Sequence, residues 1–235
     1  MRRIFFDAGP VISLTMTNLL WLLEPLKTQF KGEFCITPAV KQELIDKPFE
    51  TKRFKFEAMQ VLQYLSKGTL RVVRSDELDK KAQYLLSLAN RCYRAKESNI
   101  NIVHQGEMET LAAAILLGAD AVVVDERTTR YLIDKPERLA RRMGDKLHTP
   151  VDVDKQALGE LKRELGNIHL IRSTELVAIA FEHGLLDLYI SGGEEKAVKD
   201  LRKNLLESAI WGLKINGCSI ADSEIDDIVK FEIKG

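Results

Sequence analysis

The sequence contains few cysteines, and their spacing excludes several kinds of site. Only three occur, Cys35, Cys92 and Cys218, and no two of them form a Cys-x-x-Cys pair. An odd number of cysteines cannot complete a disulfide framework, and the pair spacing of structural zinc sites and thioredoxin-like redox sites is absent. We therefore expect three reduced, structural thiols, as is usual in a cytosolic protein.

Long apolar runs and a net charge are also missing. Asp7 interrupts the apolar residues near the N-terminus, which leaves too short a run for a signal peptide, and no stretch approaches the roughly 20 apolar residues of a membrane span. These absences predict a cytoplasmic protein with no membrane segment. Lysine plus arginine (35) equals aspartate plus glutamate (35). Any binding of nucleic acid must therefore come from a local basic patch.

The chain does contain the pattern of an α/β fold. Hydrophobic residues make up 45% of 235 residues, which is enough for a sizeable core. Five short apolar runs rich in β-formers alternate with helical patterns, which predicts an open parallel sheet of about five strands flanked by helices. The runs are residues 4–6, 34–37, 70–73, 121–124 and 168–171.

We expect one domain over residues 1–235, because no repeat or Pro/Gly/Ser-rich linker divides the chain. Residues 129–167 are rich in charge and helical in pattern, which predicts a helical insertion. Residues 90–105 are polar and are expected to be irregular. Residues 11–30 form a strongly apolar helical pattern that Pro25 is expected to kink or break.

Acidic side chains occur where the predicted parallel strands end. Asp7 ends the first strand and Asp125, followed by Glu126, ends the fourth, while Glu43 and Glu107 lie in the first turns of two helices. Each acid alone has an ordinary explanation, as a helix cap or a solvated helix residue. Because ligands bind at the carboxyl ends of parallel strands, the acids are expected to converge.

Converging carboxylates repel one another unless a cation lies among them. Mg²⁺ and Mn²⁺ prefer carboxylate and water oxygens, and no histidine or cysteine accompanies the set at ligand spacing, which argues against zinc. Such a site can activate water and neutralise the charge of a phosphodiester. The absence of a Gly-x-Gly-x-x-Gly motif after the first strand disfavours a dinucleotide enzyme.

These acids lie in segments that resemble the motifs of the PIN-domain family. The opening motif is similar to FFDAGPVISL (residues 5–14), and the second to ITPAVKQEL (residues 36–44). The third resembles GEMETLA (residues 106–112) and the fourth VVVDER (residues 122–127). The C-terminal part, from HLIRSTEL (residues 169–176) onward, resembles the longer archaeal and bacterial proteins of this type.

The resemblance implies a Rossmann-like sheet and a divalent-metal-dependent endoribonuclease that uses Mg²⁺ or Mn²⁺. Asp7, Glu43 and Glu107 would bind the metal or position water, and either Asp125 or Glu126 would be the fourth acid. The family includes the toxins of toxin–antitoxin pairs and RNA-processing nucleases, so RNA and an antitoxin protein are expected partners.

Some residues depart from the family pattern. Many members have a serine or threonine where this chain has Gly9, and the third acid is a glutamate where compact toxins have an aspartate. These departures favour an alternative, a non-catalytic PIN-like module that binds RNA or a protein. A small-molecule phosphatase would use the same carboxylates, but no residue pattern is specific to it.

Basic residues follow the fourth acid. On a helical face beside the acids they would hold the RNA backbone, and otherwise they would form a solvated face with ion pairs. The long apolar helices expected over residues 11–30 and 194–215 also favour a homodimer. The arginines of this segment are Arg127, Arg130, Arg138, Arg141 and Arg142.

Overall fold

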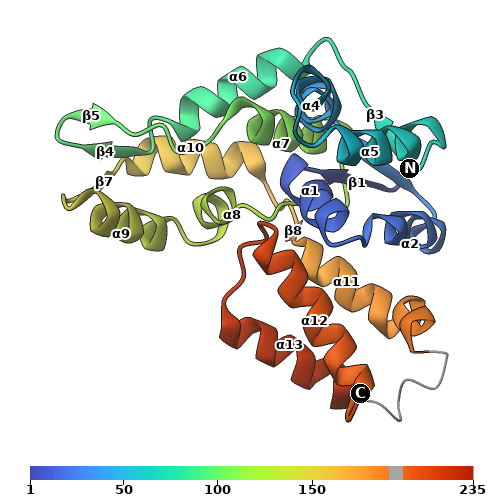
Figure 1. Cartoon of the computed structure of the whole chain (residues 1–235). Coiled ribbons are helices and arrows are strands. Elements are labelled where there is room, and N and C mark those ends of the chain that lie inside the picture. Colours follow the sequence, from blue (N-terminus) through green and yellow to red (C-terminus); the bar gives the residue numbers. More distant parts are fainter. Residues whose placement is uncertain (191–197, 235) are drawn as a thin grey trace.

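The central feature of the computed structural model, which describes residues 1–190 and 198–234, is a five-stranded parallel sheet. Its strand order is β3-β2-β1-β6-β8 and all four pairings are parallel, which confirms the α/β expectation (Figure 1). All five predicted strands are present. They are β1 (Arg3–Phe6), β2 (Glu33–Ile36), β3 (Leu70–Val72), β6 (Ala121–Val123) and β8 (Leu170–Ile171).

The strands are apolar on both sides because helices cover both faces of the sheet. Phe5 pairs with Cys35 on one side and with Val122 on the other, and all three side chains are buried. They belong to one apolar cluster, whereas their neighbours Ile4 and Phe6 belong to the other. The alternation of side chains along a strand therefore produces a three-layer molecule with two cores.

The first helical layer follows β1 and β2 along the chain. Its elements pack through residues such as Val11, Leu23 and Val61 onto the face that carries Phe6. They are α1 (Ala8–Met16), the 3₁₀ turn η1 (Leu20–Leu22), α2 (Leu23–Phe30), α3 (Pro38–Lys41), the π-helical turn η2 (Gln42–Asp46), α4 (Lys47–Glu50) and α5 (Lys55–Ser66).

The helix expected over residues 11–30 is interrupted, but not at Pro25. The break lies between Met16 and Leu20, where Asn18 has a φ of 58° and Leu19 donates a backbone hydrogen bond to Leu14. Pro25 is the third residue of α2. An amide in the first turn of a helix has no intrahelical acceptor, so proline is tolerated there.

The second layer contains five helices and a small antiparallel sheet. The helices are α6 (Leu78–Ala89), α7 (Gln105–Leu117), α8 (Arg127–Asp134), α9 (Pro136–Leu147) and α10 (Lys155–Leu165). The small sheet has the order β5-β4-β7, and its strands are β4 (Tyr93–Ala95), β5 (Ser98–Asn99) and β7 (Asp152–Val153).

The hairpin β4–β5 contradicts the irregular segment expected over residues 90–105. Ala95 pairs with Ser98, and the two residues between them, Lys96 and Glu97, both have positive φ (48° and 69°). A two-residue turn of this kind usually contains asparagine or glycine, and neither occurs at these two positions. The segment expected as a helical insertion consists mainly of α8, α9 and α10, with β7 between the last two.

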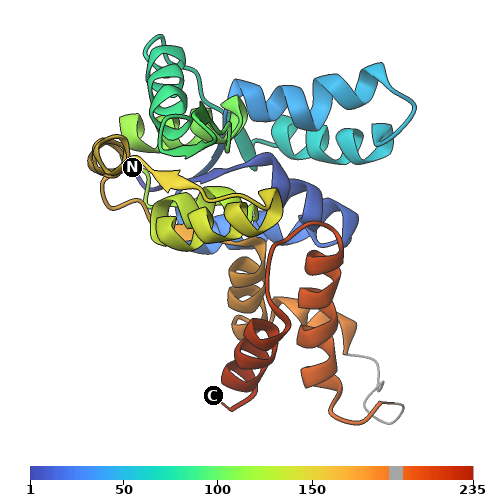
Figure 2. The same cartoon turned by 90° about the vertical axis from the view of Figure 1, so that its left-hand side faces the viewer.

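The last helices form an arm that projects from the α/β layers, visible in Figures 1 and 2. This C-terminal arm consists of α11 (Ser173–Glu182), η3 (Leu185–Tyr189), α12 (Leu201–Ile215) and α13 (Asp222–Lys234). A helix was expected from residue 194 to 215, and residues 194–197 of it lie outside the described part. No helix in the described ranges is long and apolar enough to cross a membrane.

The arm shares a core with the sheet. Val177, Phe181 and Ile210 are fully or almost fully buried in the same apolar cluster as Phe6 and Leu14. This continuity supports the single domain expected over residues 1–235, which stays a prediction.

Candidate functional site

The two central strands of the sheet both end in an aspartate. Asp7 follows β1 and Asp125 lies two residues after β6, and the amide of Asp7 donates to the carbonyl of Val123 at 3.0 Å. The chain leaves β1 toward β2 and leaves β6 toward β8, so the order of the sheet reverses between them. Clefts for ligands form at such points in open α/β sheets.

Asp7 is buried, with 8% of its surface exposed, and it does not cap α1 through its side chain. Burial raises its pKa to about 7, and the charge of Glu107 is the next largest cause. Glu43 and Asp125 raise this pKa further, while the amide of Ala8 lowers it. Ionisation of the Asp7 carboxylate therefore costs free energy in this buried and acidic environment.

Glu107 is the second carboxylate with a strongly raised pKa. Burial raises this pKa to about 7 and the charges of Glu126 and Glu43 add to it, although the amide of His104 opposes the shift. That amide donates to Oε2 of Glu107 at 2.7 Å, so Glu107 also closes the first turn of α7. Each of the five predicted acids thus interacts electrostatically with Asp7 or with Glu107, and we call this set the acid cluster.

Asp125 and Glu126 differ in their surroundings. Asp125 is 1% exposed and accepts three hydrogen bonds, from the Ser13 hydroxyl (2.6 Å), the Ser173 amide (2.8 Å) and the Ser173 hydroxyl (2.8 Å). Glu126 is exposed and accepts only from the amide of Thr128, at 3.4 Å. Asp125 is anchored in the protein, whereas the Glu126 carboxylate faces solvent beside Glu107.

Glu43 is exposed and lies in the π-helical turn η2. Such turns occur frequently at functional sites, because the extra residue changes the direction of the side chains. The structure adds a carboxylate that the sequence did not single out. Glu109 is buried and its Oε1 accepts from the amide of Ala39 at 2.9 Å, which ties α7 to the start of α3.

Four of the five predicted substrate arginines gather beside the acid cluster. They line a hollow on α8 and α9, which we call the arginine hollow: Arg127, Arg138, Arg141 and Arg142, with Tyr131 and Asp145. The Arg138 guanidinium lies 5.2 Å from the centre of the Tyr131 ring. Arg130 is not part of this hollow, because it donates to the carbonyl of Ser219 at 3.3 Å.

The acid cluster can be tested for its fit to a divalent cation. All its donors are carboxylates, which suit Mg²⁺ or Mn²⁺ and not zinc. Across residues 1–190 and 198–234, no three acidic, histidine or cysteine side chains are close enough together to form a ready-made cage. Mg²⁺ needs only one or two carboxylates plus water, so the residues fit it. The Thr129 hydroxyl is buried beside Glu107 without a well-formed hydrogen bond.

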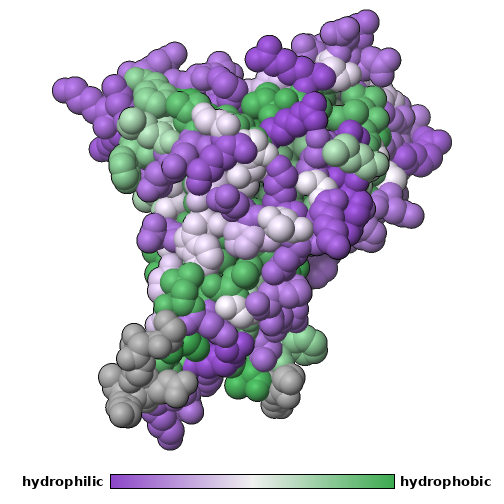
Figure 3. Space-filling view, turned by 90° about the vertical axis from the view of Figure 1, so that its right-hand side faces the viewer, coloured by the Kyte–Doolittle hydropathy of each residue, from purple (hydrophilic) through white to green (hydrophobic). Residues whose placement is uncertain are grey.

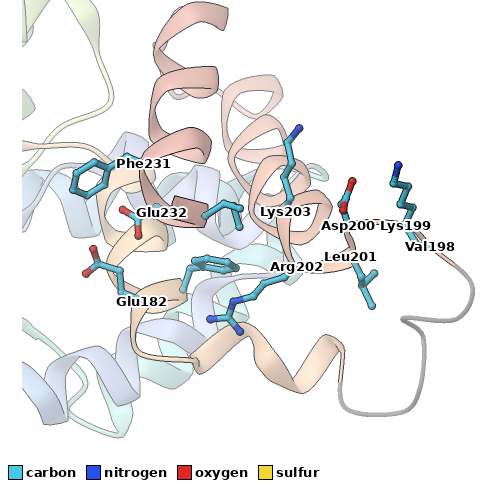
Figure 4. Close-up of a pocket in the computed structure, with 11 residues that line it drawn as sticks. Glu182, Val198, Lys199, Asp200, Leu201, Arg202, Lys203, Phe231 and Glu232 are labelled. Atoms are coloured by element: carbon cyan, nitrogen blue, oxygen red, sulfur yellow. The ribbon is translucent and has the colours of Figure 1, made fainter. Parts of the chain in front are cut away.

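A large cavity in the C-terminal arm lies apart from the acid cluster. It has a volume of about 1440 Å³ and is formed by α11, α12 and α13 in the C-terminal arm (Figure 4). Its charged lining residues include Glu182 of α11, Arg202 of α12, Glu232 of α13 and Lys199, which precedes α12. No member of the acid cluster lines it.

Comparison with known families gives one match. A family model described as a PIN domain (DUF3368) matches residues 3–138, which is more than half of the chain and includes all five acids. Neither the curated proteins nor the solved structures contain a match to this chain. On the strength of this match, the chain belongs to the PIN domain family.

Proposed function

We propose that this protein is a divalent-metal-dependent endoribonuclease that hydrolyses RNA phosphodiester bonds at the acid cluster. The observation that carries the proposal is a pair of carboxylates, the buried Asp7 and the partly buried Glu107, whose pKa values are both about 7 because of burial and neighbouring acids. A protein gains little by burying repelling acids at the cleft of a sheet, unless they serve a cation or a proton transfer.

Asp7 and Glu107 would hold Mg²⁺ or Mn²⁺, and the exposed carboxylates of Glu43 and Glu126 would complete the site with water. A bound divalent ion supplies an activated water and neutralises charge on the phosphodiester. We assign Glu126 as the fourth acid that faces the ion, because three of the acceptor positions of Asp125 are already occupied by hydrogen bonds. Asp125 would then support the site without contacting the ion.

The arginine hollow would bind the RNA backbone next to the cleavage point. Arg127 is the first residue of α8 and directly follows Glu126, so the hollow begins at the edge of the acid cluster. Four guanidinium groups against a single carboxylate, that of Asp145, give a local positive charge in a molecule whose net charge is zero. Guanidinium groups pair with phosphate through two hydrogen bonds.

The direct test is cleavage of RNA by the full chain. Purified protein is incubated with single-stranded and structured RNAs in Mn²⁺, Mg²⁺ or EDTA, beside the Asp7→Asn variant. We expect cutting only with metal and a loss of at least about a hundredfold in the variant, because a ligand to the ion is removed. Cleavage that persists in EDTA and in Asp7→Asn would overturn the proposal.

A second candidate is a non-catalytic module that binds RNA or a protein. It is favoured by the lack of a preformed three-ligand cage in the described ranges and by Gly9 in place of a hydroxyl residue. Tight RNA binding without cleavage in either metal would establish this candidate and end the nuclease proposal.

Partners and location follow from the same proposal. RNA is the expected substrate and an antitoxin protein a further partner, and the protein would act in the cytoplasm.

Apolar side chains exposed on α1 and α5, among them Met16, Phe56 and Met59, support a homodimer. Figure 3 shows apolar side chains in patches near the top of one face and along the C-terminal arm. Sedimentation that finds only monomers at micromolar concentration would exclude the homodimer.

A further inference from the structure

We propose that Ser173 is a positioning residue for the Asp125 carboxylate, and that the C-terminal arm is thereby a working part of the acid cluster. The inference rests on the proposed metal-dependent cleavage. The inference goes beyond that proposed function because the arm lies outside residues 3–138, which the family model matches.

Ser173 contacts Asp125 with both of its donors. Its amide donates to Oδ1 and its hydroxyl to Oδ2, each at 2.8 Å, and the residue is completely buried. Because Ser173 is the first residue of α11, its amide is one of those that have no acceptor within the helix. Two bonds to different oxygens fix both the position and the rotation of the carboxylate.

A second contact from the arm reaches the backbone of the same residue. The amide of Ser219, in the loop between α12 and α13, donates to the carbonyl of Asp125 at 3.1 Å. The carbonyl of Ser219 in turn accepts from Arg130 of α8. The arm therefore holds the segment that joins β6 to α8, which is the segment that carries Glu126 and Arg127.

The start of α11 is itself held rigidly. The Arg172 guanidinium is almost buried and pairs with Glu175 at 2.5 Å and with Glu224 of α13 at 3.3 Å. These pairs connect the first turn of α11 to α13 across the arm. Ser173 is thus presented to Asp125 by a braced element, as expected for a group that orients a supporting carboxylate behind a metal site.

Loss of the Ser173 hydroxyl leaves the buried Asp125 carboxylate with one donor fewer. Oδ2 then relies on the Ser13 hydroxyl while the Ser173 amide still holds Oδ1, so the orientation of the carboxylate is less tightly fixed, and the arginine hollow is unchanged. For Ser173→Ala we expect kcat to fall about tenfold or more and the Mn²⁺ concentration for half-maximal activity to rise, with the KM for RNA unchanged within about twofold. Ser173→Thr keeps both donors and should restore most of kcat.

The matched control removes a buried hydroxyl that does not touch the acids. Thr15→Val loses a hydrogen bond from the hydroxyl to the carbonyl of Val11 within α1. It should lower stability but leave the metal dependence and kcat as in the wild type. Circular dichroism and thermal unfolding of each variant establish that it is folded.

The experiment uses the full chain, a single-stranded RNA and a Mn²⁺ titration. A folded Ser173→Ala protein with wild-type kcat and metal dependence would overturn the positioning role while leaving the nuclease proposal intact. A wild-type protein that neither binds Mn²⁺ nor cuts RNA would overturn both. If Ser173→Ala does not fold, Ser173→Cys, which keeps the size and weakens the donor, is expected to change kcat in the same direction.

Discussion

At the scale of single residues, Glu109 joins two parts of the acid cluster without belonging to it. Its buried carboxylate accepts the amide of Ala39, the second residue of α3. The hydroxyl of Thr37 accepts another amide of the same turn, that of Val40. The short helix α3 continues directly into the π-helical turn that carries Glu43. Glu109 therefore sets where Glu43 lies relative to Glu107, its neighbour on α7.

We expect Glu109→Ala to lower both stability and activity. The variant leaves a partly buried amide without an acceptor, which costs about 1–2 kcal/mol of the free energy of unfolding. It also frees α3, so Glu43 is no longer held beside Glu107 and kcat should fall. Urea unfolding and RNA cleavage measure the two effects.

The conservative variant Glu109→Gln separates the hydrogen bond from the charge. Its amide oxygen still accepts from Ala39, so near wild-type stability and activity are expected. If instead Glu109→Gln loses as much activity as Glu109→Ala, the negative charge matters, and Glu109 would have to be counted with the acid cluster.

The five acids were predictable from the sequence, whereas the residues that support them were not. Asp7 and Asp125 end apolar runs, and that pattern alone places them at one edge of a parallel sheet. Ser13, Ser173 and Glu109 have no such signal, because their contacts join segments 48 or more residues apart in the chain. Such contacts depend on the packing of helices, which the sequence pattern does not specify.

At the scale of elements, the strands were predicted best. Five apolar runs became five strands because burial on both faces of a parallel sheet leaves a continuous apolar signal. The hairpin β4–β5 was missed because Lys96 and Glu97 adopt positive φ without the usual turn residues. The break in the first apolar helix was misplaced because the effect of a proline depends on its position in the helix, and the helix start was not known.

The helices α8 and α9 support a prediction about RNA binding. Arg141 and Arg142 line the arginine hollow one to two turns into α9, and neither contacts a member of the acid cluster. The double variant Arg141→Ala/Arg142→Ala should therefore raise the KM for RNA and leave kcat nearly unchanged. Loss of two phosphate contacts should also reduce the salt dependence of binding by about two ions.

Arg163→Ala is the matched control for this prediction. Arg163 is an exposed arginine on the neighbouring helix α10 and does not line the hollow. Its removal changes the net charge by one without removing a proposed contact. An equal rise in KM for Arg163→Ala would show that only overall charge matters, and would contradict a specific role for the hollow.

At the scale of the whole molecule, charges are balanced in total but separated in space. The acid cluster occupies the carboxyl edge of the sheet, and the arginine hollow begins at Arg127, the residue that follows Glu126. In the C-terminal arm, the charge of Glu175 is balanced by its neighbour Arg172. Burial would raise the pKa of Glu175, but Arg172 lowers it by more. Among the acids of residues 1–190 and 198–234, Asp7 and Glu107 are those whose pKa burial raises to about 7.

This arrangement predicts an unusual dependence of stability on pH. The pKa values of Asp7 and Glu107 are about 7 in the folded protein and near 4 in the unfolded chain. Between these values the folded protein binds more protons than the unfolded chain, so its free energy of unfolding falls as the pH rises. Without metal, stability should therefore decrease from pH 5 to pH 8. The contribution of Glu175, whose pKa is lowered, is present above about pH 4.5 and is constant over this range.

A divalent ion should reverse this trend, because it binds the ionised carboxylates and competes with protons for them. The rise in Tm on adding Mn²⁺ should be small at pH 5.5 and should grow steadily up to pH 8. Differential scanning calorimetry in EDTA and in Mn²⁺ at several pH values measures both effects.

In Asp7→Asn the neutral amide removes one repelling charge, so Tm in EDTA at pH 8 should rise, by about 2–4 °C for each kcal/mol gained. The effect of Mn²⁺ on Tm should nearly vanish in this variant. Asp46→Asn changes an exposed carboxylate paired with Lys41 and should leave both curves as in the wild type. A metal-free Tm that increases from pH 5 to pH 8 would show that the buried acids do not repel one another as the structure indicates.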